Sequence, residues 1–138
     1  MTLKKYGRSA VMGVLAGTIY GLWAIYANRG HDLAHVARAA STQFVLSSCS
    51  TALLTLLIEL VLARGRSAAH LVGAAIGPHA CMVALFIALH GLAGTPNIVT
   101  TIAPSASIGL VFSIAYVLKR SRAPKDDPAH GASPRSVT

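Results

Sequence analysis

Acidic residues are nearly absent from this chain. Only four of its 138 residues are Asp or Glu, and two of these, Asp126 and Asp127, lie close to the C-terminus. Asp32 and Glu59 are far apart in the sequence, so no pair of carboxylates is available for general acid–base catalysis. The sequence also lacks a G-x-S-x-G motif, a phosphate-binding loop and a CxxC motif. These absences argue against an enzyme and give no reason to expect a cofactor.

Charge of either sign is also scarce, at 12% of residues, whereas 54% are hydrophobic and the mean hydropathy is +0.59. This composition is typical of an integral membrane protein. The two cysteines, Cys49 and Cys81, fall inside long apolar stretches, so we expect both to be buried as small hydrophobic residues.

Four apolar stretches are long enough to cross a bilayer, which takes about 20 helical residues. They cover residues 9–27, 39–63, 68–92 and 97–118. We predict an all-α membrane domain over residues 1–118, with four transmembrane helices in a compact bundle. Thr95 is expected to be the N-cap of the fourth helix, and Pro96 its first residue. Residues 119–138 are polar and basic and predict a disordered cytoplasmic tail.

Basic residues fall mostly on one side of this predicted topology. Ten lie on the side of the two termini, against only Arg29 and Arg38 on the other; the ten are Lys4, Lys5, Arg8, Arg64, Arg66, Lys119, Arg120, Arg122, Lys125 and Arg135. Since cytoplasmic segments retain Lys and Arg, both termini are predicted to be cytoplasmic. The Ala, Gly and Arg bias suggests a bacterial inner membrane, whose anionic inner-leaflet lipids would contact this face. Because these residues flank the spans, they do not indicate nucleic-acid binding.

A polar stripe runs along the second span at four-residue spacing, and its members share one helix face: Gln43, Ser47, Thr51, Thr55 and Glu59. Unpaired polar groups in hydrocarbon cost several kcal/mol each, so this face must meet another helix, a second subunit or water. Glu59 has two readings. It either pairs with Arg64, Arg66 or Lys119 at the cytoplasmic boundary, or it is buried and carries protons.

Two prolines interrupt the third and fourth spans. Pro78 frees the carbonyl of Ala74, and Pro104 frees that of Thr100. Polar residues gather nearby: His79, Asn97, Thr101 and Ser105. The region is therefore either a pair of kinks closed by local hydrogen bonds or a ligand or ion site, as in transporters with interrupted helices.

Small residues recur at four-residue spacing in three of the spans, which is typical of close helix packing in membranes. The glycines are Gly13, Gly17 and Gly21 in the first span, Gly73 and Gly77 in the third, and Gly109 in the fourth. We expect at least one of these faces to serve a homo-oligomer. The alternative is that all of them are used within one chain.

Three histidines, His31, His35 and His90, lie near the opposite side of the membrane from the termini, together with Asp32. If they converged, they could hold Zn²⁺ or Cu²⁺. Asp32 serves equally well as a helix N-cap, and the histidines would then simply lie at the lipid interface beside Tyr20, Trp23 and Tyr26.

These observations predict a non-enzymatic inner-membrane protein that acts through helix–helix assembly, as an accessory or scaffold, with itself or with an unidentified membrane protein. The alternative is a small proton-coupled transporter or channel formed by an oligomer, in which Glu59 and the region of His79 and Pro104 line the path.

Overall fold

The computed structural model describes residues 2–122, with side chains from Val11 onward. This range forms four helices and no strand: α1 (Thr2–Asn28), α2 (Leu33–Leu62), α3 (Ala68–Leu92) and α4 (Ile98–Arg122). Each helix is long and apolar enough to cross a membrane. The predicted all-α class with four long apolar helices is thus confirmed, and it fits a multi-pass membrane protein.

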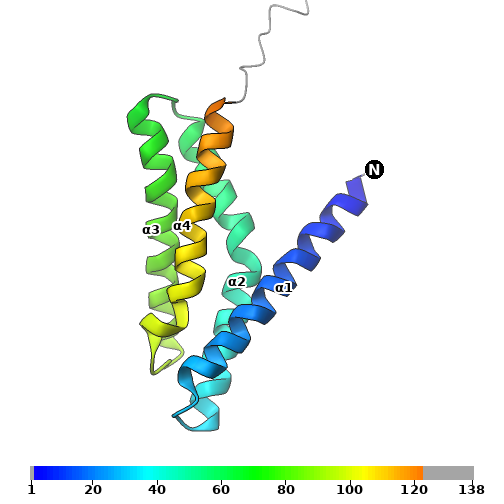
Figure 1. The fold of residues 1–138 in the computed structure, drawn as a ribbon, viewed down its shortest axis with the longest axis vertical. Helices are drawn as coiled ribbons and strands as arrows, with labels where there is room; N and C mark the ends of the chain where they lie inside the picture. The colour runs from blue at the N-terminus through cyan, green and yellow to red at the C-terminus, as the bar shows by residue number, and fades with distance from the viewer. Residues whose placement is uncertain (1, 123–138) are drawn as a thin grey trace, which may run out of the picture.

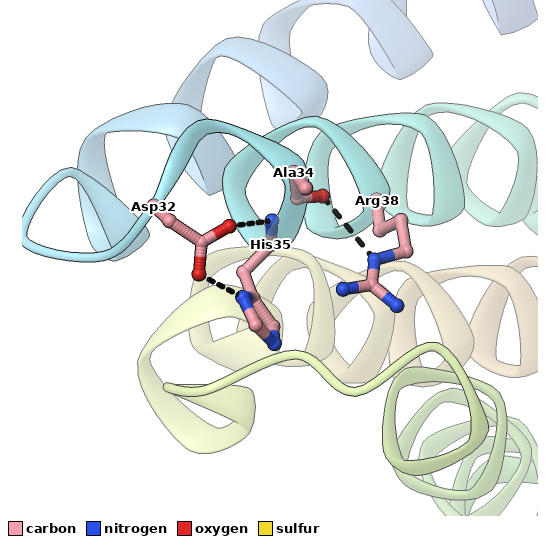
Figure 2. Close-up of polar contacts among 4 residues, drawn as sticks. All are labelled: Asp32, Ala34, His35 and Arg38. Atoms are coloured by element: carbon pink, nitrogen blue, oxygen red, sulfur yellow. Dashed lines mark hydrogen bonds and ion pairs between the residues drawn. The ribbon is translucent and has the colours of Figure 1, made fainter.

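Local signals set where α2 and α3 begin. Asp32 is the N-cap of α2, and its carboxylate accepts a hydrogen bond from the backbone N of His35 at 3.1 Å (Figure 2). Ser67 caps α3 in the same way through the backbone N of His70. α2 therefore begins earlier than the predicted span at residue 39, and residues 63–67 form the expected short turn of an α2–α3 hairpin.

The start and the end of α4 differ from the prediction. Thr95 is not its N-cap, because the Thr95 hydroxyl pairs with the buried His90 ring and α4 begins only at Ile98. At the other end α4 continues to Arg122, so residues 119–122 of the predicted disordered tail are helical. Residues 123–138 lie outside the described range.

Three of the helices, α2, α3 and α4, pack side by side around an apolar core that includes Leu54, Ile58, Met82, Phe86 and Ile102. α1 is different, because it crosses α2 obliquely and its N-terminal half leads away from the other helices (Figure 1). Among the described residues, α1 contacts α2 and α4 but not α3. The predicted compact bundle is therefore formed by α2, α3 and α4, whereas α1 packs against it along only part of its length.

The α1–α2 contact depends on glycine. A Cβ atom on Gly13 would lie 2.7 Å from the carbonyl oxygen of Ser48, and one on Gly17 would lie 2.7 Å from that of Phe44. Real Cβ atoms are not found so close to backbone, so the two helices approach closely because these side chains are missing. Gly21 lies on the same face, 3.4 Å from the Ala40 carbonyl by the same measure.

Neither cysteine is buried, contrary to expectation: Cys49 and Cys81 are both exposed on the outside of the helices. Membrane helices place apolar residues against lipid as well as against each other, so apolar surroundings in the sequence do not reveal which face is internal. The outer surface of the bundle is correspondingly rich in large apolar side chains, such as Val72, Val99 and Val111.

Candidate functional site

A cavity of about 180 Å³ lies between the four helices. Its walls are mainly apolar, but each helix also contributes polar side chains. These are Tyr20 of α1, Ser47, Ser50 and Thr51 of α2, His79 of α3, and Ser105 of α4. Two regions predicted separately, the stripe on α2 and the proline-interrupted parts of α3 and α4, therefore meet at one cavity.

The six polar side chains around the cavity fall into two groups. The serine hydroxyls are engaged within the protein: Ser50 donates to the Ser47 carbonyl, and Ser105 donates to the Ile102 carbonyl. In contrast, Tyr20, Thr51 and His79 make no hydrogen bond with any residue that the structure describes. Three helices thus each bring one polar group without a protein partner to the same cavity.

His79 owes its position to its neighbours on α3 and α4. It follows the buried Pro78 in the middle of α3, and its ring lies 3.4 Å from where a Cβ of Gly109 would be. The missing side chain at Gly109 leaves room for the imidazole between the two helices. Among the predicted packing glycines, Gly109 therefore makes space for a side chain rather than for a helix backbone.

One end of the bundle, where α1 joins α2 and α3 joins α4, holds a group of buried hydrogen bonds centred on Gln43. The Gln43 Nε2 donates to the Ser47 and Ser105 hydroxyls at 3.1 and 3.0 Å. Its Oε1 lies 2.8 Å from Nε2 of His90, and the other ring nitrogen of His90 lies 2.8 Å from the Thr95 hydroxyl. Since an amide oxygen only accepts, this arrangement places the imidazole proton on Nε2.

A second group of bonds at the same end ties α1 to α4. The Asn28 Nδ2 donates to the Thr101 hydroxyl at 2.8 Å, and the Asn28 Oδ1 accepts from the backbone N of Asn97 at 3.0 Å. The Asn97 side chain in turn donates to the Ala27 carbonyl at 3.0 Å. We call the two groups together the polar end network; its members are Asn28, Gln43, Ser47, His90, Thr95, Asn97, Thr101 and Ser105.

The carbonyl freed by Pro104 has a partner, as expected. The indole Nε1 of Trp23 on α1 donates to the Thr100 carbonyl at 2.9 Å. Trp23 therefore adds a contact between α1 and α4 next to the polar end network, in addition to its predicted place among the interfacial aromatic residues.

The opposite end holds Glu59, whose partners differ from those predicted. Its carboxylate accepts from the Tyr116 hydroxyl at 2.7 Å and forms an ion pair with Arg120, with Nε 2.7 Å from Oε1. Neither Arg64, Arg66 nor Lys119 takes this position, because α4 is placed so that residues 116 and 120, one turn apart, both face α2. The spacing of residues along α2 cannot predict how α4 is aligned against it.

The predicted stripe on α2 is therefore not one continuous path. Gln43 and Ser47 belong to the polar end network, and Ser47 and Thr51 line the cavity. Thr55 is half-buried outside the cavity lining, and Glu59 is tied to α4 beyond it. Asn97 and Thr101 likewise belong to the polar end network rather than to the cavity.

The three candidate metal-binding histidines do not converge. His35 pairs with Asp32 within one helical turn, while Arg38 bonds to the Ala34 carbonyl (Figure 2), and the buried His90 has both nitrogens engaged by Gln43 and Thr95. Within residues 11–122 no group of three His, Cys, Asp or Glu side chains has metal-binding geometry. The structure therefore does not bring His31, His35 and His90 together.

Asp32 lies at this end in the connection between α1 and α2, outside the spanning segments. Hydrogen bonds from the side chain and then the backbone N of His35 hold the pKa of Asp32 below its usual value of 3.8. The charged carboxylate also interacts favourably with the positive end of the α2 dipole.

Sequence reasoning missed three residues that matter here: Asn28, Tyr20 and Arg120. Asn28 had a usable signal, because it shares one face of α1 with Gly17, Gly21 and Ala24, all of which are buried. Tyr20 was assigned to the membrane interface and Arg120 to the topology signal, and neither role shows what the side chain contacts.

Comparison with known proteins gave no match: no family model, no curated protein and no solved structure matches the chain.

Proposed function

We propose that this chain is a small multi-pass transporter of a bacterial inner membrane, with Arg64, Arg66 and the end of α4 on the cytoplasmic side. The unequal distribution of basic residues supports this orientation. The four helices supply the walls of one substrate cavity, and the substrate is a small molecule rather than a protein.

The observation that carries the proposal is the set of unpaired polar groups around the cavity. The half-buried Tyr20 and His79 and the exposed Thr51 line the cavity from three helices, and none of them makes a hydrogen bond with a residue that the structure describes. A bound molecule or water would satisfy them. A purely structural bundle has no need to direct three unpaired groups into one cavity.

The two ends of the bundle differ in the way that alternating access requires. The polar end network joins all four helices at one end, whereas α1 leads away from the others toward the opposite end (Figure 1). The arrangement corresponds to a state closed at the polar end network and less closed at the basic end. Glu59 serves in this proposal as a structural tie between α2 and α4 and not as the proton carrier, because it lies outside the cavity lining.

Cysteine accessibility tests the proposal. In a background with Cys49→Ala and Cys81→Ala, single cysteines replace Ala16 or Ala106, which line the cavity, or Ile76, which is exposed on the outer face of α3. Maleimides react only with thiolates in water, so a membrane-impermeant maleimide should label Ala16→Cys and Ala106→Cys and leave Ile76→Cys unmodified in intact membranes.

Labelling from the cytoplasmic side only would match the proposed orientation and the closed polar end network. If neither Ala16→Cys nor Ala106→Cys reacts faster than Ile76→Cys, the cavity has no aqueous access and the transporter proposal fails.

A scaffold or accessory role through helix assembly is the second candidate, favoured by an open small-residue face on α3. Added Cβ atoms on Gly73 and Gly77 would meet nothing within 4 Å, unlike those on the α1 glycines. Native mass spectrometry from lipid nanodiscs gives the subunit number. A dimer or larger oligomer that Gly77→Leu converts to monomer would support self-assembly through α3, and a monomeric wild type would rule out self-assembly.

A further inference from the structure

We propose that the cavity binds a neutral amphipathic molecule with a body the size of one ring and a single hydrogen-bonding head group such as a hydroxyl. The inference rests on the proposed function only in that the cavity takes a small molecule. It adds the chemical class of that molecule and the residues that recognise it.

The absence of fixed charge in the lining determines that the ligand is neutral. Among residues 11–122, no Asp, Glu, Lys or Arg lines the cavity, and Glu59 is already paired with Arg120 outside it. A permanently charged ligand would lose its hydration without gaining a counter-charge, which costs several kcal/mol per ion. A neutral molecule avoids this cost.

The size and the walls determine the body of the ligand. The cavity volume is about 180 Å³, and an apolar protein cavity of about 150 Å³ is enough to hold benzene. Leu54, Phe86 and Phe112 supply apolar and aromatic surface, and the Met82 side chain adds a thioether of the kind that packs well against rings. The room and the surroundings therefore fit the body of a single ring.

The unpaired polar groups of Tyr20 and His79 determine which head group the ligand carries. A neutral imidazole has one donor and one acceptor nitrogen, and a tyrosine hydroxyl can do either. A ligand hydroxyl can therefore donate to one of His79 and Tyr20 and accept from the other. The lining serines Ser47, Ser50 and Ser105 are already engaged within the protein, and the exposed Thr51 hydroxyl is left for water.

The test uses 4-methylphenol as the probe and the full chain in lipid nanodiscs. Binding is measured by equilibrium dialysis. Empty nanodiscs serve as one blank for partition of the probe into lipid. Nanodiscs that carry the Ala106→Phe protein serve as a second blank, because the new ring fills the cavity. We expect saturable binding of one probe per chain. Toluene, which lacks the head, should bind more weakly, and the anion 4-methylbenzoate and the cation of 4-methylbenzylamine should not bind above the blanks.

Two conservative tyrosine variants make a matched pair. Tyr20→Phe keeps the ring of this lining residue and removes only its hydroxyl, and it should weaken binding about 3- to 10-fold, the effect of one lost hydrogen bond. Tyr26→Phe makes the same change on the outer face of α1, where the ring lies 4.0 Å from the Arg29 guanidinium carbon, and it should leave binding unchanged. His79→Phe should weaken binding as Tyr20→Phe does.

Several results would overturn the inference: equal binding by the Ala106→Phe protein, equal effects of Tyr20→Phe and Tyr26→Phe, or binding of 4-methylbenzoate as tight as that of 4-methylphenol. Failure of the ligand class is separable from failure of the transporter proposal. If Ala106→Cys reacts with maleimide but 4-methylphenol does not bind, the cavity is accessible and only the proposed class is wrong.

Discussion

Gln43 is the residue on which the connection between α2, α3 and α4 depends. Its fully buried amide bonds to Ser47 on its own helix, Ser105 on α4 and His90 on α3. We expect Gln43→Leu to destabilise the protein by about 1–3 kcal/mol, because it leaves the buried Nε2 of His90 without a partner and removes the bond from Gln43 to Ser105. Reversible SDS unfolding of the purified protein measures the effect.

A double-mutant cycle with His90→Leu separates the Gln43–His90 bond from its surroundings. We expect a coupling energy of about 0.6 kcal/mol, the average for hydrogen bonds between membrane helices, and no more than about 1.7 kcal/mol. Strictly additive effects would show that the two residues act independently. The polarity of position 43 and its closeness to Ser47 were evident from the sequence, but its partners Ser105 and His90 were not, because they lie on other helices whose alignment is set by packing.

The Asp32 carboxylate should titrate below its usual pKa of 3.8. The lowered pKa in the folded state means that the N-cap stabilises α2 above that usual value and that the stabilisation is lost as the pH falls through the lowered pKa. The carboxyl ¹³C shift of Asp32, followed by NMR, gives the pKa directly. His35→Ala should raise it toward 3.8, because the His35 side chain is the main cause of the shift, while His31→Ala serves as a control on the same connection.

At the scale of the helices, α1 packs closely against α2 because glycines on its contact face have no side chain. The Cβ of Gly17→Ala would meet the Phe44 carbonyl oxygen at 2.7 Å, a contact that no side-chain rotation can relieve. We expect a loss of about 1–3 kcal/mol, typical of overpacking. Gly73→Ala is the control, because its Cβ meets nothing within 4 Å and alanine is the better helix former. Equal stability of the two variants in SDS unfolding would show that the close approach of α1 to α2 is not maintained in the membrane.

The number and extent of the helices could be predicted from apolar runs, because crossing a bilayer demands length and apolarity together. The four-residue spacing of Gly13, Gly17 and Gly21 also predicted that another helix packs closely against this face. Their partner could not be predicted: the same pattern in Gly73 and Gly77 has no neighbour, so glycine spacing indicates that a helix can be approached closely but not which helix approaches it.

In the whole molecule, the site emerges from the arrangement of helices rather than from any one of them. His79 and Thr51 were recognised from the sequence as unusual residues of an apolar helix, but Tyr20 was assigned to the lipid interface. It reaches the cavity because α1 crosses α2 obliquely, a crossing angle that depends on how the glycine face of α1 meets Phe44 and Ser48. Residue spacing within one helix does not predict the angle at which two helices cross.

The two ends of the molecule should differ in mobility, because contacts are distributed unequally along α1. At one end Asn28 and Trp23 bond to α4, whereas toward the basic end the large apolar side chains of Val11, Met12 and Leu15 are all more than half exposed. Local stability follows local contacts, so we expect α1 to move relative to α4 mainly at the basic end. This motion would give a substrate access to the cavity.

Electron paramagnetic resonance distances between pairs of spin labels test this expectation in nanodiscs, in the background without Cys49 and Cys81. Labels at Ile25 and Val99, both exposed near the polar end network, should give a narrow distance distribution, and labels at Val11 and Leu118 a broad one. Asn28→Val, which removes the bonds from α1 to Thr101 and Asn97, should broaden the first distribution and leave the second unchanged. Equally narrow distributions at both ends would mean that α1 is fixed along its whole length. Access to the cavity would then have to open between α3 and α4 instead.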